Sequence, residues 1–296
     1  MIRGASLVER VAVVIPARNE QEHIFEIVKT AKQFVAMVLV VDDGSTDKTC
    51  SEAYRSGAEV VKNTQSLGVG SALKTGFWHV FEHGFTVAVA LDGDGAHDPG
   101  MIPKIVTYHL YSKSDLTIGS RLTIGGRTAN FPSTKESANR FAALLLRAAV
   151  GTRVTDVASG FRVVSRKITT LPRTSQGYGY LFESLCAATV GGLRVAEYPI
   201  QARYDARDLF GTRRAEILGL LRAAKRFAKS EDHALKLRSL LRRVDCFKNI
   251  TVRINRSQFV FHPLREYDAY LIQEQSSFFA GGMSLEGVSV DFQGTD

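Results

Sequence analysis

Residues 86–95 read TVAVALDGDG, an apolar run that ends at two aspartates separated by one glycine. A continuous run of small and β-branched apolar side chains is typical of a strand buried on both faces of a parallel sheet. Asp92 and Asp94 come directly after this run, and the glycines beside them permit a sharp turn. We therefore expect a strand over residues 86–91 with two carboxylates at its carboxyl end.

Similar apolar runs lie on both sides of this stretch. They cover residues 11–15, 37–41, 60–61 and 116–118, and further strands are expected over 158–164 and 194–200. Helical patterns separate them, over residues 20–34, 70–82 and 135–150 among others. Strands that alternate with helices predict an α/β fold, with a mostly parallel sheet that helices cover on both faces.

Polar residues follow the expected strands at their carboxyl ends. In sheets of this kind, ligands bind beyond the carboxyl ends of the strands. The polar groups at these ends are Arg18-Asn19-Glu20, Asp42-Asp43, Asp92-Gly93-Asp94 and Ser120-Arg121. We expect them to converge on one edge of the sheet and to form the functional site there.

Asp92 and Asp94 predict a metal site. Carboxylate oxygens are hard ligands that suit Mg²⁺ or Mn²⁺, which proteins usually hold with one or two carboxylates plus substrate phosphates. The alternative interpretation is a solvated turn, because Asp-Gly is common in turns. Asp43 has two interpretations that are compatible, since it can accept hydrogen bonds from a nucleoside while Ser45 or Thr46 caps the next helix.

The bulk composition favours an ordinary globular protein with anionic partners. The chain has 296 residues with 45% hydrophobic and 23% charged side chains, which excludes a disordered or fibrous class. The formal net charge of +8 favours anionic partners and does not choose among nucleotides, phospholipid head groups, lipid phosphates and nucleic acid. Three widely spaced cysteines indicate reduced thiols, and residues 1–10 do not resemble a signal peptide. No apolar stretch reaches about 18 residues, so no transmembrane helix is expected.

Two C-terminal segments differ from the rest of the chain. Residues 213–245 are helical and strongly basic in pattern, so they either lie on an anionic membrane or dock on the domain with a solvated basic face, and we favour docking. Residues 246–296 contain strand-like pieces at 251–260 and 270–273 and form a small β appendage of unassigned role. The expected division is therefore 9–212, 213–245 and 246–296.

Several motifs resemble, in order and spacing, one enzyme family. They are Val13-Val14-Ile15-Pro16-Ala17-Arg18-Asn19-Glu20, Val40-Val41-Asp42-Asp43-Gly44-Ser45-Thr46-Asp47, Gly68-Val69-Gly70-Ser71-Ala72-Leu73-Lys74-Thr75-Gly76, Asp92-Gly93-Asp94-Gly95-Ala96-His97-Asp98-Pro99, Gly119-Ser120-Arg121, Asp156-Val157-Ala158-Ser159-Gly160-Phe161 and Glu197-Tyr198-Pro199-Ile200. Over residues 9–210 the chain resembles the family 2 glycosyltransferases with the GT-A fold. The branch it resembles most is that of the dolichyl- and polyprenyl-phosphate mannose and glucose synthases.

The resemblance implies a role for each matching residue. Asp92 and Asp94 would hold Mg²⁺ or Mn²⁺, and Arg121 would lie near the phosphates. The nucleoside-binding positions would be Pro16, Arg18, Glu20, Val41, Asp43 and Gly93. The acceptor positions would be Lys135, Asn139 and Arg207, with Glu183 as an acidic residue of the acceptor half. Arg18 stands where an aromatic residue is common, Ala96 where glutamine often completes the metal shell, and residues 203–207 lack the usual Gly-x-Ser-Lys.

The resemblance also implies inverting sugar transfer from a GDP- or UDP-sugar. The first hypothesis is a lipid-phosphate acceptor, with a cytoplasmic location, peripheral membrane contact at the inner face and no nucleic-acid partner. The second is a soluble enzyme that acts on a hydroxyl, for which Asp156 or Glu183 would serve as the base. The third is a protein that binds a nucleotide sugar without turnover.

Overall fold

The centre of the fold is a seven-stranded sheet with the order β3-β2-β1-β4-β7-β5-β8. The computed structural model describes residues 10–123, 127–129, 131, 133–172, 175–203, 214–228, 247–254, 257–261, 283–285 and 288–294. The strands are β1 (Val11–Ala17), β2 (Met37–Asp42), β3 (Glu59–Lys62), β4 (Val87–Ala90), β5 (Leu116–Ser120), β7 (Arg162–Ser165) and β8 (Val195–Pro199). Only β7 runs antiparallel to its neighbours in this sheet, so the predicted mostly parallel α/β sheet is confirmed.

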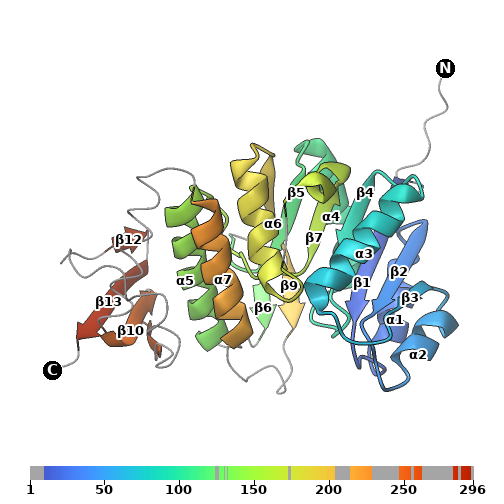
Figure 1. Cartoon of the computed structure of the whole chain (residues 1–296), viewed down its shortest axis with the longest axis horizontal. Coiled ribbons are helices and arrows are strands. Elements are labelled where there is room, and N and C mark those ends of the chain that lie inside the picture. Colours follow the sequence, from blue (N-terminus) through green and yellow to red (C-terminus); the bar gives the residue numbers. More distant parts are fainter. Residues whose placement is uncertain are drawn as a thin grey trace.

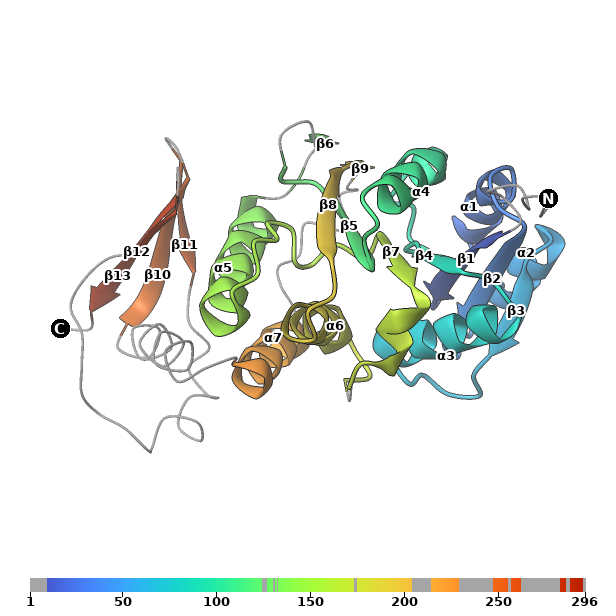
Figure 2. The ribbon, with the colours of Figure 1, turned by 90° about the horizontal axis from the view of Figure 1, so that it is seen from above.

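Helices cover both faces of this sheet (Figure 1, Figure 2). One face carries α1 (Ile24–Ala31), α4 (Ile102–Tyr111) and, near the edge, α2 (Thr49–Arg55). The other carries α3 (Val69–Glu82), α5 (Ser133–Val150), α6 (Gly179–Val190) and α7 (Arg214–Phe227). Short 3₁₀ turns, η2 (Pro99–Met101) and η3 (Arg166–Thr170), and a small parallel pair of β6 (Arg127–Ala129) and β9 (Gln201–Arg203) complete this part.

The burial of β1 explains why its sequence is apolar without alternation. Val13 and Ile15 pack into the core on the α1 face, whereas Ala12 and Val14 pack into the core on the α3 face. All four side chains are fully buried. A strand with two buried faces needs apolar residues at every position, which is the pattern that the sequence shows.

One expected strand begins later than its apolar pattern suggests. The pattern predicted strand over residues 158–164, but β7 begins only at Arg162. The carbonyl oxygens of Val157 and Ser159 accept hydrogen bonds of 2.9 Å from the buried Arg162 guanidinium. These carbonyls serve a side chain instead of a neighbouring strand, so this segment is a loop.

The basic helix α7 docks on the domain, as the favoured interpretation of its pattern expected. The core shared with α5 and α6 buries the apolar residues Leu220, Ala223, Ala224 and Phe227. The basic residues between them, Arg222, Lys225 and Arg226, are exposed. Gly219 packs against the start of α6, since a Cβ added to Gly219 would lie only 2.9 Å from the backbone nitrogen of Gly179. The expected helical residues 229–243 lie outside the described part of the chain.

The C-terminal strands form a separate antiparallel sheet with the order β11-β10-β13-β12. They are β10 (Phe247–Ile254), β11 (Ser257–Phe261), β12 (Met283–Leu285) and β13 (Val288–Gly294), and the expected strand over 270–273 lies outside the described residues. The division of the chain at residues 213 and 246 stays a prediction. Within the described residues, no helix combines the length and the apolar character that a membrane span requires.

Candidate active site

The functional residues lie where parallel strands end at the same edge of the sheet. β1 pairs with β2 up to Ala17 and Asp42, and the backbone of Asp43 donates a 2.9 Å hydrogen bond to the Ala17 carbonyl. On the other side of β1, the backbone of Leu91 donates to the Val14 carbonyl at 3.1 Å. The residues that follow β1, β2 and β4 are therefore neighbours in space, as the sequence predicted.

Asp92 and Asp94 occupy a turn directly after β4. Asp94 is exposed, and its Oδ1 accepts a 2.9 Å hydrogen bond from the backbone of Ala96. Gly95 has φ +80°, a conformation that L side chains rarely adopt and that makes this tight turn possible. The Asp92 side chain is one-third exposed (33%), and its Oδ2 lies 3.3 Å from Nε2 of the buried His97.

The surroundings of Asp92 favour its ionised form. Burial raises the pKa of this carboxyl group, but the hydrogen bond with His97 and the positive charges of Arg121 and Arg162 lower it by more than burial raises it. The net effect is a pKa below the usual range, so Asp92 carries its negative charge at neutral pH. An ionised carboxylate with an exposed part is what a divalent cation requires.

Gly93 brings the ends of β1 and β4 into close contact. A Cβ on Gly93 would lie 3.3 Å from the Pro16 carbonyl oxygen and 3.5 Å from Cγ of Glu20. Three of the predicted nucleotide-side residues are therefore together. Arg18 is exposed in the same loop, whereas the Val41 side chain is fully buried and packs in the core.

The loop after β1 is fastened to the turn after β2. Asn19, at φ +59°, donates from its backbone to Ser45 Oγ at 3.0 Å, and its Oδ1 accepts from the backbone of Thr46 at 2.9 Å. The backbone of Glu20 donates to Thr49 Oγ1 at 2.7 Å. The polar side chains after both strands thus lock the two loops together.

Asp43 organises the loop that leads into α3. Its carboxylate accepts hydrogen bonds from the side chains of Asn63 (2.9 Å) and Ser66 (2.8 Å) and from the backbones of Leu67 and Gly68 (both 2.8 Å). Burial raises the Asp43 pKa, but these four bonds outweigh burial and hold the pKa below its usual value. Asp43, which is predicted to bind the nucleoside, therefore also fixes the loop over residues 63–68.

Arg121, Asp156 and Asn139 form a buried network at the end of β5. The Arg121 guanidinium donates to both Asp156 oxygens at 2.7 Å, and Asn139 Nδ2 donates to Oδ1 at 2.6 Å. Burial raises the Asp156 pKa, but the charge and hydrogen bonds of Arg121 and the Asn139 amide lower it below the usual range. Lys135 lies one helical turn before Asn139 on α5, so it is on the same face of that helix.

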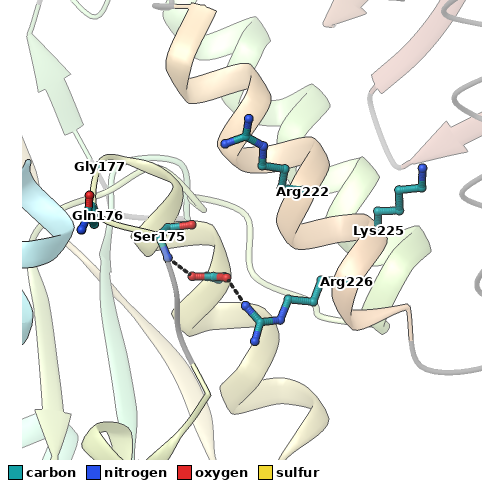
Figure 3. A pocket seen from close by; sticks show the side chains of 7 residues that line it. Ser175, Gln176, Gly177, Arg222, Lys225 and Arg226 are labelled. Carbon is teal, nitrogen blue, oxygen red and sulfur yellow. Dashed lines mark hydrogen bonds and ion pairs between the residues drawn. The ribbon is translucent and has the colours of Figure 1, made fainter. Parts of the chain in front are cut away.

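Glu183 belongs to a different cluster, which Figure 3 shows. It lies on α6, is 3% exposed, and accepts hydrogen bonds of 2.8 Å from Arg226 of α7 and from the backbone of Ser175. These residues line a cavity of about 690 Å³ together with Gln176, Gly177, Arg222 and Lys225. In Figure 3, Arg222 and Arg226 extend toward the 175–177 loop and Lys225 extends the other way. Arg207 lies outside the described residues.

Two supporting residues were not assigned a role from sequence. Glu197 of β8 accepts hydrogen bonds of 3.0 Å from the backbones of Thr155 and Asp156, so it fixes the turn that presents Asp156. Arg162 is fully buried, and burial lowers its pKa to about 10, while the charges of Asp156 and Asp92 act against this. The sequence feature that could have revealed both residues is a charged side chain within an apolar strand pattern. A buried charge without a partner would destabilise the fold, so such a residue is expected to have one.

The donor set fits a metal that is bound jointly with a substrate. Among the described residues, no group of three or more His, Cys, Asp and Glu side chains could hold a metal ion. Mg²⁺ and related ions, however, are usually bound by one or two carboxylates and complete their shell with water and substrate phosphates. Asp92 and Asp94 provide two such carboxylates in one turn.

Comparison with known proteins gives a consistent result. The family model Glycosyl transferase family 2 matches residues 12–170. The undecaprenyl-phosphate mannosyltransferase of Micrococcus luteus is 32% identical over 202 residues, which are 64% of this chain and 82% of that protein. The polyprenol monophosphomannose synthase of Mycolicibacterium smegmatis is 31% identical over 204 residues, which are 65% and 77% of the two chains.

Solved structures show the same architecture. Glucosyl-3-phosphoglycerate synthase from Mycobacterium tuberculosis, in complex with phosphoglyceric acid, has a TM-score of 0.59 at 25% identity and covers 73% of this chain and 80% of its own. A complex of that enzyme with Mn²⁺, uridine diphosphate and phosphoglyceric acid gives 0.58 at 25% identity, with 73% and 78% covered. The chain therefore belongs to glycosyltransferase family 2 and is a glycosyltransferase with the GT-A fold.

Proposed function

We propose that this protein transfers a sugar, with inversion, from a GDP- or UDP-sugar to a polyprenyl or dolichyl phosphate, with the help of Mg²⁺ or Mn²⁺. The observation that carries the proposal is the turn of Asp92 and Asp94 at the same sheet edge as the Asp43 loop and the end of β1. Two carboxylates for a metal thus lie next to the predicted nucleoside residues.

Similar proteins support the donor and the metal. The solved complex described above contains Mn²⁺ and uridine diphosphate, and the M. luteus and M. smegmatis relatives are named for mannose transfer to prenyl carriers. A bound divalent cation neutralises charge that builds up on a departing diphosphate. Asp92 and Asp94 would hold this ion, and Gly93 would let the chain approach the nucleotide closely.

Arg121 would supply the fixed positive charge near the phosphates. Its guanidinium is held in place by hydrogen bonds to both carboxylate oxygens of Asp156 and lies 5.0 Å from the centre of the Phe131 ring. A cation that is oriented before the substrate binds stabilises developing negative charge without reorganisation during the reaction. Asn139 and Lys135 of α5 would contact the acceptor phosphate at this end of the network.

The state of the two candidate bases supports a phosphate acceptor over a hydroxyl acceptor. Asp156 is paired with Arg121, and Glu183 is paired with Arg226. The charge of Arg121 helps to hold the pKa of Asp156 below its usual range, so Asp156 is poorly suited to remove a proton from a hydroxyl. The Glu183 oxygens already accept hydrogen bonds from Arg226 and the Ser175 backbone. A phosphate oxygen is already anionic near neutral pH, and its attack requires positioning rather than a strong base.

Peripheral contact with an anionic membrane is part of the same proposal. The apolar face of α7 is occupied by the core, so its contact with a membrane would depend on the exposed basic residues Arg222, Lys225 and Arg226. The basic cavity beside Glu183 would add to the attraction for a lipid that carries phosphate. Such contact would be electrostatic, and high salt would weaken it.

Turnover of labelled donors tests the proposal. The full-length protein is incubated with radiolabelled GDP-mannose, UDP-glucose or UDP-N-acetylglucosamine, Mn²⁺ and either extracted polyprenyl phosphates or soluble acceptors. We expect label in the organic phase, and EDTA should abolish it. Label that appears only in a soluble product would favour the hydroxyl acceptor. Nucleotide-sugar binding without any product would contradict the proposed transfer.

A further inference from the structure

We infer that Gly160 is a positioning residue of the proposed metal site, because its missing side chain leaves the space in which the Asp92 carboxylate stands. The inference rests on the proposed role of Asp92 as a metal ligand. A Cβ on Gly160 would overlap both carboxylate oxygens of Asp92 and would lie 2.7 Å from its Cγ. No ordinary side chain at position 160 is compatible with this orientation of Asp92.

The backbone conformation of Gly160 does not itself require glycine. Its φ angle is not positive, unlike that of Gly95 or Gly84. Gly160 is therefore not in the left-handed conformation that favours glycine. The requirement for glycine at this position is the volume that the Asp92 carboxylate fills.

The backbone around Gly160 cannot easily move away from Asp92. The carbonyl oxygen of the next residue, Phe161, accepts a 2.8 Å hydrogen bond from the backbone of Gly119. Arg162 then pairs with Ala90 and Ile118 in the sheet, and its guanidinium holds the carbonyl of Ser159. The segment is thus fixed on both sides of Gly160, so an added methyl group would displace the Asp92 side chain rather than the strand.

His97 completes the same arrangement by holding one oxygen of Asp92. Its Nε2 lies 3.3 Å from Oδ2, its side chain is 2% exposed, and its ring packs against Phe161 with 5.6 Å between centroids. Nδ1 of His97 is buried without a hydrogen-bond partner among the described residues. The tautomer that fits carries its proton on Nε2 and donates it to Asp92, because a proton on Nδ1 would be buried without an acceptor.

Together these contacts orient the Asp92 carboxylate before any ligand arrives. Oδ2 is held by His97, and Gly160 leaves room for the group as a whole. Supporting groups that orient a metal ligand are commonly worth ten- to a hundredfold in metal affinity. Gly160 should therefore act on metal affinity through Asp92 without touching the ion.

The test is Mn²⁺ binding by the full-length protein, measured by electron paramagnetic resonance and calorimetry with uridine diphosphate present. We expect Gly160→Ala to raise the Kd for Mn²⁺ at least tenfold, with a melting temperature close to that of the parent. Gly84→Ala is the matched control: it lies before β4 instead of after it, at φ +86° and with open space around it. It should cost stability through backbone strain and leave the Kd for Mn²⁺ unchanged.

Two further variants keep the inference testable if Gly160→Ala does not fold. His97→Phe keeps the ring but removes the donor, so it should weaken Mn²⁺ binding, whereas His97→Gln keeps an N–H donor and should restore part of the affinity. Asp92→Asn tests the metal role of Asp92 itself. If Asp92→Asn loses Mn²⁺ and Gly160→Ala binds within twofold of the parent, the inference is wrong and the metal site stands. If Asp92→Asn binds Mn²⁺ normally, the metal role of Asp92 and this inference both fail.

Discussion

The Arg121 guanidinium donates two hydrogen bonds of 2.7 Å to the Asp156 carboxylate, from Nε to Oδ2 and from Nη2 to Oδ1. Both groups are nearly excluded from water, with side-chain exposures of 9% and 0%. The backbone of Arg121 adds a third hydrogen bond of 2.9 Å to the same carboxylate. Asp156 therefore fixes where the positive charge of Arg121 lies. This ion pair explains why an acidic residue stands at position 156 without a role as catalytic base.

Asp156→Asn should damage both stability and donor binding. An amide cannot accept two charged hydrogen bonds, so Arg121 would be left as a buried cation without its anion. Removal of one partner of a buried ion pair typically costs about 3–5 kcal/mol of unfolding free energy. We expect a clear fall in melting temperature, and a rise in the KM for the sugar nucleotide, measured by urea or thermal unfolding and by donor titration.

A surface pair on α5 provides the control for Asp156. Glu136 and Arg140 form an i,i+4 ion pair with side-chain exposures of 29% and 28%. Glu136→Gln should change stability by less than about 0.5 kcal/mol, since exposed pairs contribute little. If Asp156→Asn lowered kcat alone, with stability and KM like those of the Glu136→Gln control, Asp156 would be the catalytic base after all.

Asp94→Ala should abolish sugar transfer and leave the fold intact. Asp94 is exposed, and its carboxylate accepts a hydrogen bond from the Ala96 backbone within its own turn. Loss of such a bond costs on the order of 1 kcal/mol. Activity with saturating Mn²⁺ and the melting temperature are measured on the same preparation. Retained transfer by Asp94→Ala would remove it from the metal site.

Asp43→Ala should loosen the loop over residues 63–68 and weaken donor binding together. Four donors, including the backbones of Leu67 and Gly68, would lose their acceptor at once. A hydrogen bond to a charged group contributes about 1.5–3 kcal/mol, and water that reaches these partly exposed donors would offset part of the loss. Hydrogen exchange should report faster exchange at Leu67 and Gly68, and nucleotide titration should report a higher Kd. An unchanged Kd with a loosened loop would limit Asp43 to a structural role.

The sequence predicted the strands and their shared edge because a strand that is buried on both faces requires a continuous run of apolar residues. Every position of β1 must be apolar, so residues 11–15 were readable as a strand without the structure. The turn of Asp92 and Asp94 was readable for a similar reason, since the glycines and the carboxylates occur together. The helical pattern over residues 135–150 likewise predicted the start of α5 to within two residues.

The supporting interactions were not readable, because they depend on which residues meet across the fold. Ala158 and the apolar residues after it suggested a strand, yet Arg162 draws the carbonyls of that segment to its own guanidinium. Glu183 was grouped with the acceptor residues by position in the sequence, but its ion pair with Arg226 depends on how α7 packs on α6. A long-range contact between polar side chains has no period in the sequence that could reveal it.

His109 should make the stability of the domain depend on pH. It lies on α4, is 3% exposed, and pairs through Nδ1 with Thr117 Oγ1 at 2.9 Å. Burial lowers its pKa to about 4, against a smaller opposing effect of the Asp115 charge. The folded protein therefore keeps this imidazole neutral at pH values where the unfolded chain protonates it. Stability is fully present above the unfolded pKa of about 6.5 and is lost as pH falls toward 4.

The size of this effect can be measured by urea unfolding at pH 8 and pH 5. A depressed pKa of this size predicts a loss of about 2 kcal/mol over that interval from His109 alone. In His109→Gln, which keeps a polar partner for Thr117, the loss should be smaller by about this amount. His83→Gln, at an exposed histidine at the end of α3, is the matched control and should lose as much stability as the parent. Parallel pH profiles for His109→Gln and the parent would mean that His109 accepts its proton in the folded state as readily as in the unfolded chain.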